Sequence, residues 1–387
     1  MLQKSIFTHM NELAQRAGSV NLGQGFPDYQ PPSALLESVH AAMHHHAFQY
    51  APSSGSGALC RVLSQLWMDD WGIELEAESE ITVTAGATQA LGDAVRSLLR
   101  PGDEVVLLDP AYDSYAPAVE NAGGIPVRIP LDYSHELGFS LPWDALNDRI
   151  HSKTRLMILN HPHNPTGLVC QAEDYTKLEQ LMAKHPQLHL LGDEVYAYMV
   201  YEGSFHSLLS LSAFRERIMV VHSFGKTFHC TGWKLGYAAG SPTWMKAFRR
   251  VHEFNVFCVN SLIQKAFELF LPTDQTRMQI ASMYREQRDL LMELIQKGPF
   301  WAIPVQGTYF QWIDCSAATG KTALTGRQDI HLAEDWCLNG GCTLIPFSPF
   351  MDEGNAYKET FMRVCFAKST EKMQAGFSNL YKHLSCA

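Results

Sequence analysis

Three residues that could do chemistry lie within twelve positions of one another: Ser223, Lys226 and Lys234. The apolar run 218–221 leads directly into them and predicts a short buried strand. A hydroxyl and an ammonium group can hold phosphate oxygens, while a second amine can condense with an aldehyde as a Schiff base. The stretch therefore suits a phosphorylated aldehyde, with Lys226 as its covalent anchor. A surface loop with solvated lysines is the alternative that this stretch alone leaves open.

A second apolar run, 81–83, is followed by Gly-Ala-Thr at 86–88, where a helix is predicted to begin. The free backbone N–H groups and the positive dipole end of such a helix favour a bound phosphate. A plain helix N-cap formed by Thr84 or Thr88 would use the same residues. The sequence at this position leaves both interpretations open.

Two more apolar runs end in groups that could contact a planar ring. The run 105–108 is followed by Tyr112, which could stack on a cofactor, although an aromatic side chain there could equally serve packing. The run 156–159 is followed by the turn sequence Asn-Pro-Thr-Gly, which begins at Asn164. The amide of Asn164 could donate a hydrogen bond to a phenolic oxygen of such a ring.

Asp193 follows the apolar run 188–191 almost directly. A carboxylate at the end of a buried strand is costly unless a cationic group accompanies it. A protonated pyridine nitrogen would be one such partner, and a structural arginine would be another.

The elements that must position these residues are short apolar strands that alternate with longer amphipathic segments between about residues 81 and 240. This pattern predicts an α/β layer with a mostly parallel sheet, buried on both faces and flanked by helices. Because ligands bind at the carboxyl ends of parallel strands, the residues above are expected to meet at one edge. No dinucleotide fingerprint is present, since the glycine-rich loop 21–28 has neither the spacing nor a preceding strand.

The sequence pattern changes beyond about residue 265. An amphipathic helix is predicted over 278–297, followed by separate strands. These strands are expected at 308–313, 342–345 and 361–366. We therefore predict a large α/β domain over residues 36–265 and a smaller α+β domain made of 1–35 and 266–387, with a ligand cleft between the two.

Composition excludes several classes of function. A net charge of -10 over 387 residues argues against nucleic acid as a partner. No apolar run is long enough for a membrane span and no secretory signal is visible, so a cytoplasmic protein is expected. The nine cysteines include no Cys-x-x-Cys pair, which argues against a zinc site or a disulfide framework. The tract His44-His45-His46 could bind a metal, but a helix C-terminus accommodates imidazoles anyway, so no metal is expected.

Taken together, four motifs resemble the class I aminotransferases of the aspartate aminotransferase fold. They are Asn-Pro-Thr-Gly at 164–167, Asp-Glu-Val-Tyr at 193–196, Ser-Phe-Gly-Lys-Thr at 223–227 and Gly-Trp-Lys-Leu-Gly at 232–236. The loop 21–28 and the segment Gln-Tyr-Ala-Pro at 49–52 resemble more narrowly the kynurenine/glutamine aminotransferase branch, including bacterial methionine aminotransferases. The resemblance covers essentially the whole chain.

The resemblance implies pyridoxal 5'-phosphate as cofactor and a homodimer with shared active sites. The catalytic residues that it implies are Lys226, Asp193 and Tyr196. The cofactor-binding residues that it implies are Gly86, Ala87, Thr88, Tyr112, Asn164, Asp193, Tyr196, Ser223, Lys226 and Lys234, joined by Tyr50 from a partner subunit. Substrate is expected to bind at Gly25 and Asn164 and at Arg363, whose guanidinium would hold the carboxylate in a bidentate fork.

The predicted activity moves the α-amino group of methionine and of aromatic or glutamine-like amino acids to a 2-oxo acid, by ping-pong chemistry through the Lys226 Schiff base. The donor pocket is expected to be lined by Phe26, Tyr29, Tyr112 and Phe347, with no second cation. A cysteine-conjugate β-lyase would use the same groups and remains an alternative. A non-enzymatic cofactor-binding regulator is disfavoured, because no basic helix for DNA binding precedes residue 30.

Overall fold

The computed structural model describes residues 5–45, 47–319, 328–355, 357 and 359–386. Its principal element is a seven-stranded sheet in the order β2-β10-β9-β8-β7-β3-β4, which confirms the predicted α/β layer. All neighbouring pairs are parallel except those of β10, which runs antiparallel to both β2 and β9. The strands of this sheet are β2 (Ile81–Thr84), β3 (Glu104–Asp109), β4 (Ile125–Pro130), β7 (Thr154–Asn160), β8 (His189–Asp193), β9 (Ile218–Ser223) and β10 (Gly236–Gly240).

The five predicted strands all form, but β4 and β10 were not predicted. Strand β10 reads Gly-Tyr-Ala-Ala-Gly and lacks the β-branched residues that mark a strand. Strand β4 contains Pro126 and Pro130, which are compatible with its position at the edge of the sheet. The prediction for β8 was also short by two residues, because the strand continues through Gly192 to Asp193.

Helices cover both faces of the sheet, as continuously apolar strands require. On one face α4, α5 and α9 pack against β3, β7, β8, β9 and β10 in a core that includes Val95, Leu107 and Phe248. The opposite face carries α3 and α7, with Trp67 and Leu181 in the second core. The helices of the described chain up to residue 270 are α1 (Ile6–Ala17), α2 (Ser33–Ala42), α3 (Gly57–Trp71), α4 (Ala87–Leu98), α5 (Tyr115–Asn121), α6 (Trp143–Arg149), α7 (Ala172–Lys184), α8 (Phe224–Thr227), α9 (Pro242–Val256) and α10 (Ser261–Phe270).

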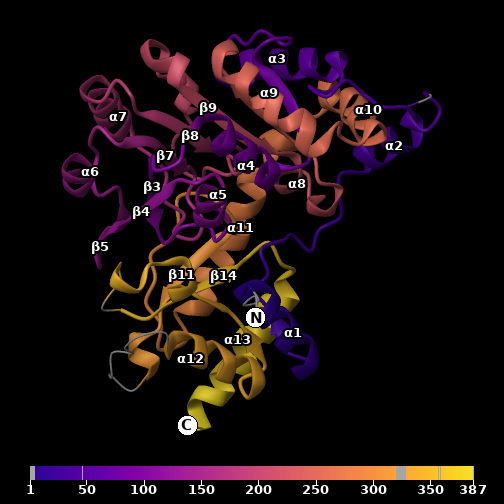
Figure 1. Ribbon diagram of the computed structural model, residues 1–387. Coiled ribbons are helices and arrows are strands. Elements are labelled where there is room, and N and C mark those ends of the chain that lie inside the picture. The colour runs from indigo at the N-terminus through magenta and orange to yellow at the C-terminus, as the bar shows by residue number, and fades with distance from the viewer. Residues whose placement is uncertain (1–4, 46, 320–327, 356, 358, 387) are drawn as a thin grey trace.

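A second, smaller sheet lies at the other end of the molecule and has the order β11-β14-β13 (Figure 1). The predicted strand at 342–345 is divided in the structure, because β12 pairs with β1 while β13 pairs with β14. The remaining elements are β1 (Val20–Asn21), the hairpin β5 (Asp132–Ser134) and β6 (Gly138–Ser140), α11 (Thr276–Ile295), β11 (Phe310–Asp314), α12 (Gln328–Leu338), β12 (Cys342–Thr343), β13 (Ile345–Pro346), β14 (Phe361–Cys365) and α13 (Thr370–Cys386).

The N-terminal segment joins this smaller part, as Figure 1 shows by the indigo α1 near the yellow α13. The pairing of β1 with β12 fixes that association. Helix α11 extends between the two parts of the molecule (Figure 1). The boundaries at 35/36 and 265/266 remain a prediction. No described helix is both long enough and apolar enough to cross a membrane.

Candidate active site

A cavity of about 290 Å³ opens at the carboxyl ends of the parallel strands, between the large sheet and the smaller part. It brings together twelve of the thirteen predicted site residues, all except Tyr50. Those residues are Gly25, Gly86, Ala87, Thr88, Tyr112, Asn164, Asp193, Tyr196, Ser223, Lys226, Lys234 and Arg363. The strand-end rule therefore located the cavity, and Arg363 enters it from β14 of the smaller sheet.

Lys226 lies in the short helix α8, immediately after β9. Its Nζ donates to the backbone oxygen of Gly25 at 3.2 Å. The pKa of Lys226 is lowered to about 8, chiefly by burial and also by the positive charges of Arg363 and Lys234, while Cys365 and Asp193 oppose the shift. An amine with this pKa is unprotonated in a much larger fraction of molecules near neutral pH, so it can act as a nucleophile or as a base.

Asp193 ends β8 and is buried. Its Oδ2 accepts a hydrogen bond from the Tyr115 hydroxyl at 2.5 Å, whereas its Oδ1 has no partner among the described residues. Burial raises the pKa of Asp193 to about 6, although the Tyr115 hydrogen bond opposes this rise. The side-chain partner of Asp193 in the structure is thus a tyrosine and not the arginine considered from the sequence. One carboxylate oxygen remains available for a cationic ligand.

The opposite end of the cavity has the features of an anion site. Gly86 precedes α4 with φ +81°, and a Cβ added there would lie 3.4 Å from Lys234 Nζ. No side-chain hydrogen bond caps α4, and the Thr84 hydroxyl instead donates to the Gly86 carbonyl oxygen at 3.3 Å. The first N–H groups of α4 therefore remain free for a ligand, with Lys234 beside them.

Arg363 is fully buried, and its guanidinium is held in place from several sides. Its Nη1 donates to Asn164 Oδ1 at 3.0 Å and its Nη2 donates to the Gly23 carbonyl oxygen at 2.9 Å. The Phe310 ring lies 4.1 Å from the guanidinium carbon. The Nε of Arg363 has no partner among the described residues. This orphaned donor and the buried charge suit a carboxylate ligand.

Several residues of the cavity were missed by the sequence analysis. Tyr115 holds Asp193, and Asn160 accepts the backbone N–H of Asn164 at 2.7 Å. Asn160 could have been found, because it is the last residue of the run that forms β7. The cavity wall also includes Phe7, Gln24, Phe26 and Phe310. Of these, only Phe26 was predicted.

Two residues predicted for the donor pocket do not line the cavity. The Tyr29 hydroxyl donates to the Lys368 carbonyl oxygen at 2.9 Å, which turns the ring toward the smaller part. Phe347 is buried and packs against Phe139 and Phe361. The prediction for these two rings was wrong because sequence position does not determine the direction of a ring.

Tyr50 is 78% exposed and packs edge-on against Phe257, outside the cavity. Its predicted role requires a second copy of the chain and stays a prediction. In the tract 44–46, His46 lies outside the described residues, and His44 packs edge-on against His40. The described residues contain no cluster of three or more side chains suited to a metal ion.

Comparison with known proteins matches residues 17–378 to the family described as aminotransferase class I and II. The chain belongs to this family. It is 37% identical to the methionine aminotransferase of Escherichia coli over 381 residues, which are 98% of this chain and 96% of that protein. It is 34% identical to the kynurenine–oxoglutarate transaminase of Dictyostelium discoideum, with coverage of 98% and 94%.

The solved structure of YbdL from Escherichia coli, which is described as having a methionine aminotransferase function, matches with a TM-score of 0.92 and 36% identity. The match covers 99% of this chain and 97% of that one. The predicted aspartate aminotransferase fold is therefore confirmed, as is the resemblance to the methionine and kynurenine aminotransferases. These aminotransferase relatives favour transamination over β-elimination or a regulatory role.

Class I aminotransferases use pyridoxal phosphate, and the residues of the cavity fit this group. The partnerless Oδ1 of Asp193 suits a pyridinium N–H, while the free N–H groups of α4 beside Lys234 suit a phosphate. Lys226 provides an amine of lowered pKa between these two ends. These three features match the ring nitrogen, the phosphate and the aldehyde of the cofactor, respectively.

Proposed function

We propose that this aminotransferase moves the α-amino group of methionine and of aromatic or glutamine-like amino acids to a 2-oxo acid, in two half-reactions. The observation that carries the proposal is the placement of Lys226, the free oxygen of Asp193 and the guanidinium of Arg363 around one aromatic-walled cavity. The bound pyridoxal phosphate would supply an electron-accepting ring. The residues of this chain would orient the reactants and move the protons.

Lys226 would hold the cofactor covalently and, once released, would carry the proton of the substrate Cα. Its lowered pKa supports this role, because a base that operates near neutral pH must be able to lose its own proton. Asp193 would keep the ring nitrogen protonated, and Asn164 and Tyr196 would flank the phenolic oxygen. Tyr112 would cover the ring face, and its ring packs edge-on against Tyr115 with 5.5 Å between the ring centroids.

The phosphate would be held by the residues at the anion end of the cavity, Gly86, Ala87, Thr88, Ser223 and Lys234. Arg363 would bind the α-carboxylate that every donor and acceptor shares, with the Gly25 backbone alongside. A Cβ added at Gly25 would lie 2.9 Å from the Phe310 ring and 3.6 Å from Arg363 Nη2. This crowding explains why a glycine suits the position.

The choice of side chain follows from the charges of the cavity wall. Among its lining residues the cations are Lys226, Lys234 and Arg363, and each of them has a role in the scheme above. No lining cation is therefore left for a second, distal carboxylate. Phe7, Phe26 and Phe310 offer aromatic surface, against which a thioether or a phenyl group is favourably buried.

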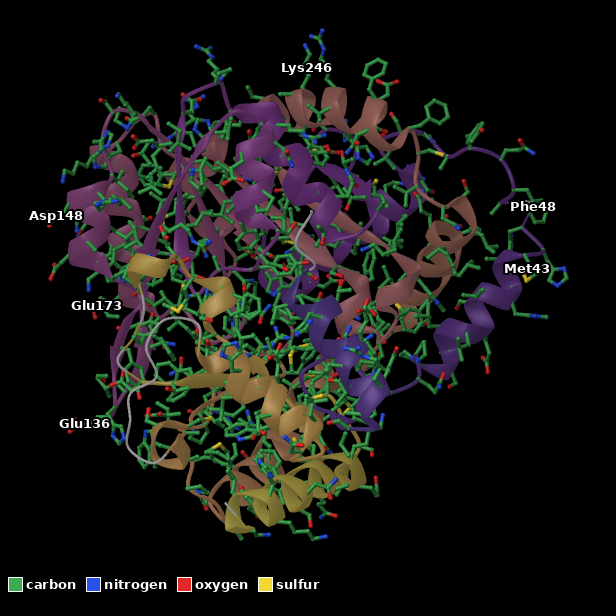
Figure 2. The ribbon with its side chains drawn as sticks, turned by 60° about the horizontal axis from the view of Figure 1, so that its bottom comes forward. Met43, Phe48, Glu136, Asp148, Glu173 and Lys246 are labelled. Carbon is green, nitrogen blue, oxygen red and sulfur yellow. The ribbon has the colours of Figure 1, made fainter. Side chains whose placement is uncertain are left out.

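We further infer a homodimer in which Tyr50 of each copy reaches the partner's phosphate site. The exposed Tyr50, Phe254 and Phe257 support this inference, because such an apolar surface is characteristic of an interface. Figure 2 shows Phe48 and Met43, which are also exposed, near each other at one end of the molecule. We also infer a cytoplasmic location, because the eight cysteines whose side chains are described form no disulfide.

The proposal is tested by single-turnover half-reactions with individual amino acids. Conversion of the bound cofactor to its amine form should be fast with methionine, phenylalanine or glutamine and slow with aspartate. Aspartate reacting as fast as methionine would overturn the predicted donor class. Pyruvate release from a cysteine conjugate, measured in parallel, separates β-elimination from transamination.

A further inference from the structure

Arg363 is positioned by a segment that also contacts the large sheet. We name residues 348–355 the strap. Its central residue Phe350 lies over the Arg363 guanidinium at 5.8 Å and packs against Phe7 at 5.4 Å, and the Phe7 ring itself lies 4.9 Å from that guanidinium. The strap therefore forms part of the aromatic surround of the buried charge.

One end of the strap is attached to the smaller part of the molecule. Asp329, near the start of α12, accepts the backbone N–H of Ser348 at 2.8 Å and its hydroxyl at 2.5 Å. Both oxygens of this buried carboxylate are used in the contact. The beginning of the strap is thus fixed to the part of the chain that also contains Arg363.

The other end of the strap is attached to the large sheet through Asp109 and Arg128. The Phe350 carbonyl oxygen accepts from Arg128 Nη2 at 2.6 Å and from the backbone N–H of Ala111 at 2.7 Å. Asp109 Oδ2 accepts from the Asp352 backbone at 2.8 Å and from the Asn355 side chain at 2.9 Å. These contacts bind the strap to the C-terminal ends of β3 and β4.

Asp109 and Arg128 form an ion pair of their own, with 2.7 Å between Asp109 Oδ1 and the guanidinium. The carboxylate is fully buried, and its second oxygen is used entirely by the strap. Ala111, which also holds Phe350, is the residue directly before Tyr112 in the cavity wall. The strap therefore links the ring-covering side of the cavity to Arg363.

We propose that Asp109 and Arg128 are positioning residues for substrate, which hold Phe350 so that Arg363 keeps a fixed place relative to the cofactor end of the cavity. The inference rests on the proposed carboxylate-binding role of Arg363. A guanidinium displaced by a fraction of an ångström loses bidentate geometry, so substrate binding should depend on the strap. Cofactor binding should not, because the strap residues do not line the phosphate end of the cavity.

The test uses Arg128→Lys, which keeps a charge for Asp109 but cannot also bond the Phe350 carbonyl in the same fork. The holoenzyme is titrated with 3-phenylpropanoate, a carboxylate without a reactive amine. We expect its binding to weaken about tenfold, as for one lost charged hydrogen bond. The KM values for methionine and for the 2-oxo acid should rise together, with the affinity for cofactor unchanged.

Two further variants make the result specific. Arg215→Lys is the matched control, because Arg215 likewise bonds a carboxylate, Glu80, and a backbone carbonyl, that of Glu74, outside the cavity. It should leave binding of the probe unchanged. Asn355→Ala removes the strap's side-chain bonds to Asp109 Oδ2 and to the Arg128 carbonyl oxygen, while both side chains of the ion pair are kept. It should weaken binding of the probe in the same direction even if Arg128→Lys folds poorly.

A double-mutant cycle with Arg363→Lys decides whether the strap acts through Arg363. In that case Arg128→Lys should add almost nothing to the loss caused by Arg363→Lys. Unchanged probe binding in Arg128→Lys, or losses that multiply in the double variant, would overturn the inference and leave the proposed function standing. Unchanged probe binding in Arg363→Lys would instead show that the proposed carboxylate site is wrong, and the inference with it.

Discussion

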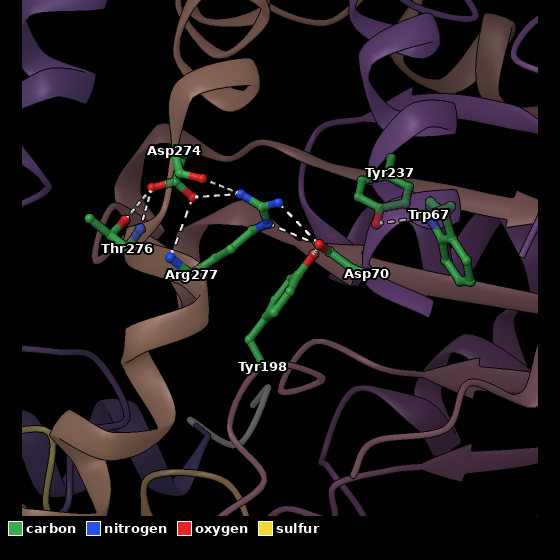
Figure 3. A network of polar contacts seen from close by, with 7 residues as sticks. All are labelled: Trp67, Asp70, Tyr198, Tyr237, Asp274, Thr276 and Arg277. Atoms are coloured by element: carbon green, nitrogen blue, oxygen red, sulfur yellow. Dashed lines mark hydrogen bonds and ion pairs between the residues drawn. The ribbon is translucent and has the colours of Figure 1, made fainter. Parts of the chain in front are cut away.

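Two carboxylates in the large part of the molecule, Asp70 and Asp193, illustrate how similar side chains serve different purposes. Asp70 lies in α3 with a side chain only 5% exposed, and it accepts Arg277 Nε at 2.9 Å, Arg277 Nη2 at 3.0 Å and the Tyr198 hydroxyl at 2.6 Å (Figure 3). Asp193 is also buried, but its only side-chain partner among the described residues is the Tyr115 hydroxyl, and its Oδ1 has none. The first carboxylate is saturated by the protein, and the second is not.

The network around Asp70 extends to the start of α11. Asp274 accepts the backbone N–H and the hydroxyl of Thr276 and also contacts Arg277 (Figure 3). Every carboxylate oxygen in this network has a protein donor, so the network stabilises the junction of α3 and α11. A buried carboxylate with an oxygen that accepts no hydrogen bond does not stabilise the ligand-free protein in this way. Its presence is explained if that oxygen contacts a bound ligand.

The largest effect that tests this contrast is expected for Asp193→Asn. Turnover should fall by several orders of magnitude, because a lost charge partner for the ring nitrogen raises the barrier and each ~1.4 kcal/mol is about tenfold. The free energy of unfolding of the cofactor-free protein should not fall, since the carboxylate is only half satisfied there. Steady-state kinetics and urea unfolding measure the two quantities. Activity within a few-fold of the unmodified enzyme would show that Asp193 is merely structural.

The opposite pattern is expected for Asp70→Asn. Breaking one partner of a buried ion pair should lower the free energy of unfolding by about 3 kcal/mol, while activity per folded molecule changes little. Asp69→Asn is the matched control, because Asp69 is the exposed neighbour in the same helix and should change stability by less than about 0.5 kcal/mol. Loss of turnover without loss of stability in Asp70→Asn would remove the distinction between the two carboxylates.

The contrast also explains which parts of the site the sequence could predict. Strand ends are local features, so Tyr112, Asn164, Asp193 and Lys226 were found from the apolar runs that precede them. The partner of Asp193 was not found, because Tyr115 reaches it from a helix 78 positions earlier and only the packing of α5 on the sheet brings them together. Both a pyridinium and an arginine satisfied the sequence argument, and the structure alone distinguishes a saturated from an unsaturated carboxylate.

Features that depend on two elements meeting were the least predictable. The family resemblance supplied Arg363, but the contacts that hold it come from the loop at Gly23, from Asn164 and from the strap. The antiparallel strand β10 was missed because its small residues show no recognisable pattern of apolar side chains. Its pairing with β9 and β2 nevertheless completes the sheet. Small residues are required there, since a Cβ at Gly236 would lie 2.5 Å from the His222 carbonyl oxygen.

A third prediction concerns Lys226, the buried cation of the site. Its pKa of about 8 is below the ordinary 10.5, so its contribution to stability is complete above pH 10.5 and is lost as the pH falls through 8. Lys226→Met should therefore raise the free energy of unfolding of the cofactor-free protein at pH 7. We expect roughly 2 kcal/mol, because solvent in the cavity screens part of the cost.

The gain should shrink as the pH is raised from 7 toward 10, which urea unfolding at each pH can measure. Lys246→Met is the control, because Lys246 projects into solvent (Figure 2) and should show no comparable pH-dependent gain. A gain in Lys226→Met that stays constant between pH 7 and pH 10 would mean that it reflects packing and not charge.

The smallest effect is expected for Tyr115→Phe, which removes the side-chain hydroxyl that donates to Asp193 Oδ2. The Tyr115 hydroxyl stabilises the ionised carboxylate, so its loss should raise the pKa of Asp193 above the present value of about 6. A protonated Asp193 cannot pair with a pyridinium. As the pH is lowered, cofactor affinity should therefore begin to fall at a higher pH in this variant than in the unmodified protein. A net hydrogen bond is worth about 1 kcal/mol, so a displacement of roughly one pH unit is expected.

Cofactor binding measured between pH 5 and pH 8 tests this expectation. The cofactor phosphate also titrates near pH 6, but it does so in both proteins, so the difference between their two curves isolates Asp193. Tyr381→Phe is the matched control, because its hydroxyl bonds the Leu294 carbonyl outside the cavity. If Tyr115→Phe and the unmodified protein gave superimposable curves, the Tyr115 bond would not set the charge of Asp193. The pKa of Asp193 would then be set by burial and by its other neighbours, the Val195 backbone, Lys226 and His222.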